Sequence, residues 1–263
     1  MLFYGKKELA KATPDGKGFY VKIRTLPLKQ SIKGHPRLGN KLKFGNINSY
    51  TKAQKIIGSL SVPSKMPTFG YSLPALSCKK GSQLKNIKGS TCESCYGFKG
   101  WYRISWVRYA MEKRSIAINN IDWVDAMTFS IKYHSLSEFR WHDTGDLQSL
   151  EHFRKIVDVA INTPEVIHWL PTQEYQIIEE FWNQAGQVPL SKLIPNLKIR
   201  LSSEMINELP PFQLALKIGV LTSMVADDTS LNKFNCPSSL QNNQCKECRK
   251  CWSDDFCVIY RKH

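Results

Sequence analysis

The stretch "SEFRWHDTGDLQSLEHFRKIVDVAINTPEVIHWLPTQE", residues 137–174, has the pattern of a strand, a helix and a second strand. Both of its apolar runs are short and end in polar loops, as strands of a parallel sheet do. The segment between them carries apolar residues at helical spacing, namely Leu147, Leu150, Phe153, Ile156, Val157 and Ala160. This order predicts a β-α-β unit with parallel strands and a right-handed crossover.

The same alternation continues downstream to residue 228, with helices predicted over 175–186 and 209–219 and strands over 196–204 and 220–228. Upstream, helices are predicted over 48–60, 101–120 and 122–135, a strand over 18–27, and turns over 62–74. The Trp and Tyr residues of 101–120 are expected mostly in the core. We therefore expect an α/β fold, either a partial (β/α) barrel or an open parallel sheet.

Three regions are predicted along the chain. Residues 1–75 form a basic, irregular N-terminal region packed on the main domain, residues 76–235 form the β/α domain, and residues 236–263 form a cysteine-rich tail. The chain has no apolar signal-peptide core near its start and no apolar run long enough to span a membrane. These features favour a cytoplasmic protein with no membrane contact, in which grouped cysteines bind metal rather than form disulfides.

The net charge of +15 is unevenly distributed. Residues 1–114 carry 23 Lys and Arg against 4 Asp and Glu, whereas residues 115–263 carry 14 against 18. A basic half of this kind attracts polyanions, and nucleic acid is one partner class that it indicates. An acidic host protein is the alternative partner, and a role in solubility is the third interpretation.

Three cysteines in the segment 78–97, "CKKGSQLKNIKGSTCESCYG", are spaced C-x13-C-x2-C. A structural zinc site normally has four protein ligands, and no histidine lies between Cys78 and Cys95. A [4Fe-4S] cluster with three cysteine ligands leaves one iron for a substrate or cofactor, so the spacing of Cys78, Cys92 and Cys95 favours a cluster. The fourth iron is either open or bound by Cys257, His142 or another cysteine.

The segment 236–257, "CPSSLQNNQCKECRKCWSDDFC", contains two overlapping C-x2-C steps. Such steps place thiolates on one metal ion or cluster, and the interleaved Lys246, Arg249 and Lys250 offset their negative charge. A second site is therefore predicted, whose metal is either zinc or an iron-sulfur cluster. Its ligands would be Cys236, Cys245, Cys248 and Cys251, unless the tail folds back and lends one thiol to the first cluster.

Polar residues follow the predicted strands at the sheet edge where parallel α/β folds bind their ligands. We expect a cofactor-binding pocket from these residues: His142, Asp143, Asp146, Thr172, Glu174, Ser202, Ser203 and Glu204. The alternative is helix capping, because Asp146, Thr172 and Ser203 each precede a predicted helix. No catalytic residue can be assigned from the sequence.

Five blocks carry a resemblance that spans residues 72–252: "SLPALSCKKG", "STCESCYGFKGWY", "FRWHDTGDLQS", "WLPTQE" and "CKECRKCW". In this order they resemble an uncharacterised family of bacteriophage proteins, which is itself similar to radical S-adenosylmethionine (radical SAM) barrels. The resemblance implies a phage-encoded iron-sulfur protein that binds a [4Fe-4S] cluster and, if it is an enzyme, S-adenosylmethionine. The chain departs from the radical pattern in its C-x13-C-x2-C spacing, in Ser94, and in lacking a Gly-Gly-Glu motif.

Three functions remain open at this stage. The first is a radical SAM-like enzyme that acts on nucleic acid, with Lys79, Lys80, Lys99 and Arg103 guiding the polyanion to the first cluster. The second is a non-catalytic cluster protein that senses redox state or iron, or that uses the cluster structurally. The third is a zinc-stapled protein that binds nucleic acid or a host partner.

Overall fold

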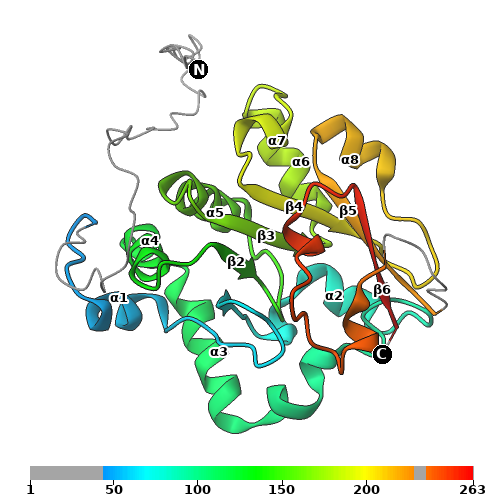
Figure 1. The fold of residues 1–263 in the computed structure, drawn as a ribbon, viewed down its shortest axis with the longest axis horizontal. Coiled ribbons are helices and arrows are strands. Elements are labelled where there is room, and N and C mark those ends of the chain that lie inside the picture. Colours follow the sequence, from blue (N-terminus) through cyan, green and yellow to red (C-terminus); the bar gives the residue numbers. More distant parts are fainter. Residues whose placement is uncertain (1–43, 228–234, 263) are drawn as a thin grey trace.

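Six parallel strands form one open sheet whose spatial order follows the chain, from β1 to β6 (Figure 1). The structure, a computed structural model, describes residues 44–227 and 235–262, so the predicted strand at 18–27 and most of the basic region lie outside the described residues. The strands are β1 (Gly70–Tyr71), β2 (Glu138–Trp141), β3 (Ile167–Thr172), β4 (Leu197–Ser202), β5 (Leu221–Ala226) and β6 (Cys257–Arg261). Of the two arrangements predicted from the sequence, the open parallel sheet is confirmed, and the strands of the described residues do not close into a barrel.

Eight α-helices lie in the described residues: α1 (Tyr50–Ile57), α2 (Lys79–Leu84), α3 (Ser105–Ala117), α4 (Trp123–Tyr133), α5 (Leu150–Asn162), α6 (Tyr175–Gln184), α7 (Leu190–Leu193) and α8 (Phe212–Ile218). Short 3-10 helices η1 (Ala75–Ser77), η2 (Tyr96–Phe98), η3 (Gly100–Arg103), η4 (Pro237–Leu240) and η5 (Lys250–Trp252) lie around the cysteines. The helices predicted within 48–60, 101–120, 122–135, 147–164, 175–186 and 209–219 are all present. The strand β1 lies in a stretch interpreted as turns, and β6 lies in the predicted tail.

The main core lies between the sheet and its helices. Side chains alternate between the two faces of a strand, so Phe139 and Trp141 of β2 both face this core, as do Leu170 of β3 and Ile199 of β4. Helices α4, α5 and α6 contribute the other side of the core, and Ser149 caps α5 by accepting from the His152 amide at 3.1 Å.

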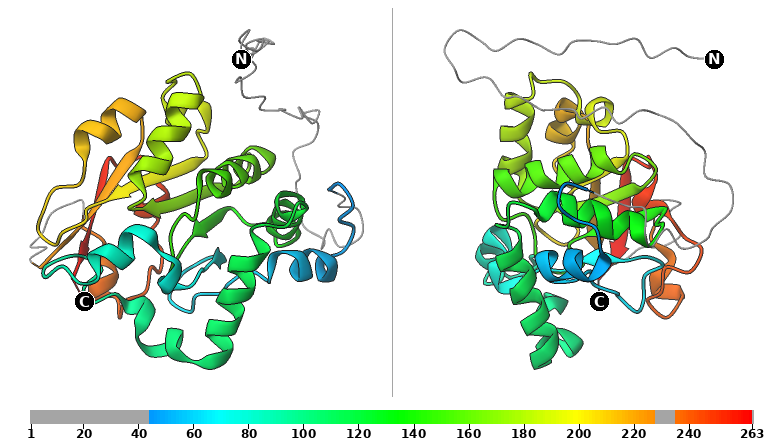
Figure 2. Two further views of the ribbon diagram at one scale, coloured as in Figure 1. Left: turned by 180° about the vertical axis from the view of Figure 1, so that it is seen from behind. Right: turned by 90° about the vertical axis from the view of Figure 1, so that its left-hand side faces the viewer.

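The cysteine-rich segment covers the opposite face of the sheet. Figure 2 shows the orange and red C-terminal segment on the other side of the sheet from the yellow-green helix α6. A second, smaller core forms there from Trp169, Cys251, Trp252 and Val258. The Trp252 ring nitrogen donates to the Phe139 carbonyl at 3.0 Å, and β6 extends the sheet beside β5. Consequently the segment is joined to the β/α domain by both packing and strand pairing.

Candidate metal and cofactor site

The first three cysteines converge at the carboxyl edge of the sheet. The 13-residue interval between Cys78 and Cys92 is occupied by α2 and a return loop. A Cβ atom added at Gly81 of α2 would lie 3.7 Å from the Cys78 sulfur and 3.6 Å from the Cys92 sulfur. A Cβ added at Gly97 would lie 3.4 Å from the Cys95 sulfur. Glycines thus leave space beside all three sulfurs.

The return loop is anchored on the end of β4. Ser90 forms a β-bridge with Met205, and the Thr91 amide donates to the Glu204 carbonyl at 2.9 Å. Gln173, which follows β3, accepts from the Cys92 thiol at 3.2 Å and donates to the Ser203 carbonyl at 2.9 Å. These contacts bring Cys92 back to Cys78, so the long interval is compatible with one shared site.

Burial opposes ionisation of these thiols. It raises the pKa of the Cys92 thiol to about 11, and the neighbouring Cys95 adds to this shift. The pKa of Cys78 is raised further, first by burial and then by Asp146 and the two other cysteines. Three thiolates could coexist here only with a compensating positive charge, which a metal centre supplies.

Asp146 connects the loop after β2 to the end of β3. Its carboxylate accepts from the Thr172 hydroxyl at 2.6 Å and from the amides of Leu147 and Gln173 at 2.7 and 2.9 Å. Burial nevertheless raises the pKa of Asp146 to about 7, and Glu174 adds to the shift. Because the N-cap of α5 is Ser149, Asp146 does not cap that helix as the capping alternative expected.

Capping explains only part of the remaining pattern. The N-cap of α6 is Glu174, whose amide is bound by the Thr172 hydroxyl at 3.0 Å. Thr172 thus supports the start of that helix, as the capping alternative expected. Ser203 is followed by a loop rather than a helix, so it has no capping role.

Glu174 and Glu204 are linked through Lys80. The Lys80 amide donates to Glu174 Oε1 at 2.8 Å, and its ammonium pairs with Glu204 Oε1 at 2.9 Å. Ser202 is the last residue of β4, two positions before Glu204, and its hydroxyl is 2.9 Å from that of Ser223 on β5. Most of the predicted strand-end residues are therefore grouped around the first cysteines.

Unlike the other predicted strand-end residues, His142 packs against a second histidine and Asp143 is bound by tyrosines. His142 has φ 52° and turns its ring toward His152, with ring centroids 5.3 Å apart, and burial lowers its pKa well below the usual range. Asp143 accepts from the Tyr102 hydroxyl at 2.9 Å through Oδ2, and its carbonyl accepts from Tyr96.

Four buried polar groups near the strand ends have atoms without a hydrogen-bond partner in the described part of the chain. They are both ring nitrogens of His142, Asp143 Oδ1, Thr144 Oγ1 and Ser203 Oγ. Buried polar atoms are nearly always satisfied in folded proteins, so these atoms indicate a ligand or water at this edge.

The cysteines of the C-terminal segment form a second group. Burial raises the pKa of Cys251 to about 12 and also raises that of Cys245, and Cys236 contributes to both shifts. Cys248 contributes to the shift of Cys245, whose amide is held by the Lys65 carbonyl at 3.0 Å. The predicted four cysteines therefore lie near one another.

Cys257 lies apart from that group. It occupies the start of β6, opposite Thr222 of β5, and its thiol interacts with the Thr222 side chain. Burial raises the pKa of Cys257, and no other cysteine contributes to the shift. As the side chains stand, no three His, Cys, Asp or Glu residues within 44–227 and 235–262 are close enough to hold one metal ion.

The predicted nucleic-acid residues lie around the first site with different exposures. Lys79, Lys99 and Arg103 are exposed, whereas Lys80 is partly buried in its pair with Glu204. The expectation that the aromatic residues of 101–120 are mostly core is wrong for Trp101, Trp106 and Tyr109, which are 72%, 67% and 64% exposed. The reason is that α3 buries mainly its Met111 and Arg114 side.

Sequence reasoning missed several residues that organise the two sites. Gln173 contacts Cys92 and Tyr102 contacts Asp143. The sequence could have indicated them, because they lie within the blocks "WLPTQE" and "CYGFKGWY". Arg140 stacks on Trp169 with its guanidinium 4.4 Å from the ring centroid, and Arg200 is fully buried beneath the second cysteine group. An arginine within an apolar strand pattern was the available signal for both.

A family model described as Gene product 88 matches residues 39–254, which is most of the chain. The chain belongs to the Gene product 88 family. This places it among phage gene products, as the sequence blocks suggested. The search of curated proteins and the search of solved structures gave no significant match. Within the described residues of this Gene product 88 member, none of the helices has the length and apolar character to cross a bilayer.

Proposed function

We propose that this chain is an iron-sulfur protein of radical SAM type, in which Cys78, Cys92 and Cys95 bind a [4Fe-4S] cluster. The observation that carries the proposal is the convergence of these three cysteines at the carboxyl edge of a sequentially ordered parallel sheet. That edge is where parallel α/β folds place their cofactors and substrates.

The donor set fits such a cluster. Thiolates are soft ligands that favour iron-sulfur clusters and zinc. Each of the three thiols would hold one iron of such a cluster, which leaves the fourth iron open. The glycines beside the sulfurs leave room that any larger residue would fill.

When bound, a reduced cluster with an open iron supplies one electron for reductive cleavage of S-adenosylmethionine to methionine and a 5′-deoxyadenosyl radical. The residues of this chain would bind and orient that cofactor. The unpartnered Ser203 hydroxyl and Asp143 Oδ1 are available for its hydroxyl and amino groups. The carboxylates of Glu174 and Glu204 favour its positive charge, and Tyr96 and Tyr102 fix Asp143 in place.

The second cysteine group would hold a separate metal centre. Cys236, Cys245, Cys248 and Cys251 provide four thiols, which suit zinc or an iron-sulfur cluster. The segment that carries these cysteines lies on the other face of the sheet and is fixed by Arg200 and Trp252. Its role in the proposal is to hold the C-terminal segment on the sheet, because metal-binding energy at such a site is folding energy.

Anaerobic purification followed by iron, sulfide and zinc analysis and an absorption spectrum tests the first part of the proposal. Iron and acid-labile sulfide are expected, with loss of about one cluster's iron in Cys92→Ser and none in the matched Cys257→Ser. Stoichiometric zinc without sulfide would overturn the cluster and favour the zinc-stapled alternative.

Incubation of the reduced protein with S-adenosylmethionine tests the second part. Formation of 5′-deoxyadenosine that is lost in Cys92→Ser is expected. A protein that contains the cluster but forms none of this product would overturn the radical activity, and would favour a redox-sensing or structural cluster.

A further inference from the structure

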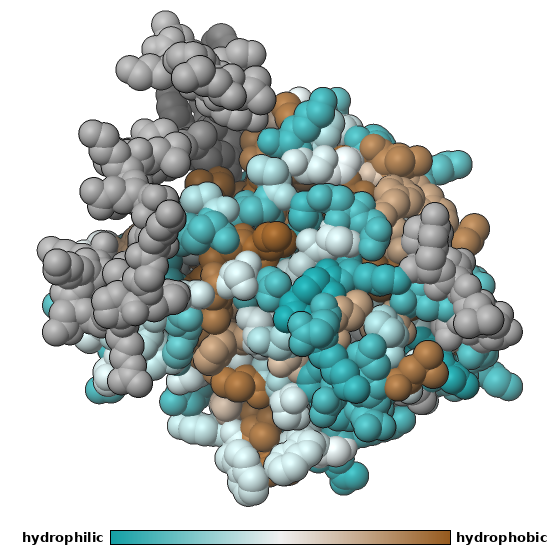
Figure 3. Space-filling model, viewed as in Figure 1, coloured by the Kyte–Doolittle hydropathy of each residue, from teal (hydrophilic) through white to brown (hydrophobic). Residues whose placement is uncertain are grey.

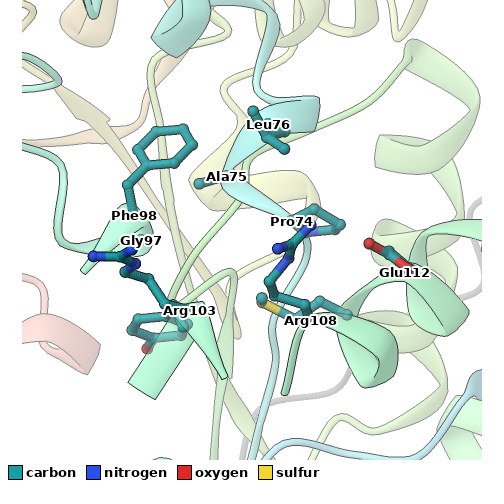
Figure 4. A pocket seen from close by; sticks show the side chains of 10 residues that line it. Pro74, Ala75, Leu76, Gly97, Phe98, Arg103, Arg108 and Glu112 are labelled. Carbon is teal, nitrogen blue, oxygen red and sulfur yellow. The ribbon is translucent and has the colours of Figure 1, made fainter. Parts of the chain in front are cut away.

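A cavity of about 330 Å³ lies directly beside the first cysteine site. It is enclosed by η1, by the η2–η3 segment and by α3, and its lining includes Phe98, Tyr102, Arg103 and Arg108 (Figure 4). Gly97 also lines it, and a Cβ added there would be 3.4 Å from the Cys95 sulfur. The cavity is therefore separated from the proposed cluster by the width of a glycine.

Exposed aromatic rings lie on the same segment as the cavity. Trp101 of η3 and Trp106 and Tyr109 of α3 have most of their surface in solvent, and Ile116 follows at 74% exposed. Figure 1 places α3 at the lower end of the molecule, and Figure 3 shows pale and brown side chains there beside a hydrophilic area. Large rings that are exposed together on one segment are typical of a binding site.

The segment that contributes most of the cavity lining is strongly basic, although Glu112 also lines the cavity. Residues 79–113 contain seven exposed cations and two exposed acids, Glu93 and Glu112; the cations are Lys79, Lys85, Lys88, Lys99, Arg103, Arg108 and Lys113. Arg103 and Arg108, which line the cavity, form no ion pair with the described residues. Free arginines beside exposed rings match a ligand that has both phosphates and planar bases.

We propose that the surface around the cavity, formed by Trp101, Arg103, Arg108 and Tyr109 and named here the α3 surface, binds single-stranded nucleic acid. One unstacked nucleotide enters the cavity, its neighbours stack on the exposed rings of Trp101 and Tyr109, and the two arginines bind the flanking phosphates. A cavity at the small end of ligand-pocket sizes admits a single base and not a duplex. The inference names the substrate class of the proposed cluster site and rests on that proposal for its chemistry.

The test is a fluorescence anisotropy titration of the full, anaerobically purified chain. The probes are a fluorescein-labelled oligothymidylate of about 20 nucleotides and a duplex of equal length, titrated between about 50 and 200 mM salt. Tighter binding of the single strand is expected. Removing the exposed ring in Trp101→Ala or Tyr109→Ala should weaken this binding roughly 5- to 150-fold per stacked base without changing the salt slope.

Charge variants separate phosphate contacts from stacking. Arg103→Ala and Arg108→Ala should each reduce the log-log salt slope by about 0.7, whereas the controls Lys192→Ala on α7 and Leu216→Ala on α8 should bind as the parent does. Both controls are exposed and lie on helices at the opposite end of the molecule from α3 (Figures 1 and 2).

Three outcomes overturn the inference. Unchanged affinity in both ring variants, or tighter binding of the duplex, would show that the cations merely attract phosphates in general. No binding at the lowest salt would assign the α3 surface to a protein partner instead. Iron and sulfide analysis of the same preparations shows whether the cluster is present. Loss of nucleic-acid binding can therefore be distinguished from loss of the cluster.

Discussion

Arg200 is the buried cation whose replacement best tests how the cysteine-rich segment is held on the sheet. Its guanidinium is fully buried and donates to five main-chain carbonyls at 2.7 to 3.1 Å, those of Thr222, Lys250, Cys251, Ser253 and Asp255. Four of these carbonyls belong to the segment that carries Cys251. We expect Arg200→Met to detach this segment, because a thioether cannot donate to any of them.

The expected loss of stability is large. A hydrogen bond from a charged donor contributes about 1.5 to 3 kcal/mol, but removing Arg200 also removes the cost of burying its charge. The net decrease in the free energy of unfolding should be about 3 to 5 kcal/mol, comparable to breaking a buried charged network. Urea unfolding followed by circular dichroism measures it, and the metal content of the variant reports on the cysteine group.

Lys198→Met is the matched control, because Lys198 lies on the same strand and pairs with the exposed Asp254 of the same segment. The Lys198 side chain is mostly buried but Asp254 is exposed, and an ion pair with a solvent-exposed partner contributes less than about 1 kcal/mol. If Arg200→Met cannot be isolated, Arg200→Lys keeps the charge with fewer donors and should fall between the two. Equal stability of Arg200→Met and Lys198→Met would refute the assigned role of Arg200.

Three further predictions address the C-terminal cysteines, the buried His168 and the glycine beside Cys95. Cys248→Ser should lower the free energy of unfolding by about 3 kcal/mol, which is roughly the contribution of one ligand to the proposed four-thiolate site. Cys257→Ser should lower it by less than about 1 kcal/mol, because all four proposed ligands remain. Equal urea midpoints of the two variants would count against the second metal centre. Burial lowers the pKa of His168 to about 3. Between about pH 6.5 and pH 3, His168 is therefore protonated in the unfolded chain but not in the folded chain. The contribution of His168 to the free energy of unfolding is therefore complete above pH 6.5 and decreases by about 1.4 kcal/mol per pH unit as pH falls toward 3. In a plot of the free energy of unfolding against pH, His168→Gln should lower the slope in this range by that amount. An unchanged slope would contradict this assignment. Gly97→Ala places a Cβ 2.7 Å from a threonine hydroxyl oxygen and 2.8 Å from an alanine methyl, so it should displace the Cys95 turn and lower the iron content of the protein. The control Gly186→Asn lies in open space at φ 75°, which asparagine tolerates, and should keep the iron content of the parent.

The β/α order was predictable because the helical and strand periods are distinct in residues 137–228. Short elements were not. The two-residue strand β1 lacks enough positions to show a period, and β6 follows a metal-type cysteine pattern that hid its "CVIYR" run. The exposure of Trp101 and Trp106 was also missed, because a hydrophobic ring gives no local sign of whether another element covers it.

The sequence by itself determined the order of strands and helices, the two cysteine groups and their spacing, and the excess of cations in the first half. These depend on local periodicity and composition, which are properties of neighbouring residues. Only the tertiary structure decided that α2 returns Cys92 to Cys78, that Cys257 lies apart from the other C-terminal cysteines, and that Arg200 is held by five carbonyls. The physical reason is that each of these contacts joins residues distant in the chain, and their meeting depends on how the sheet and its two covering layers pack.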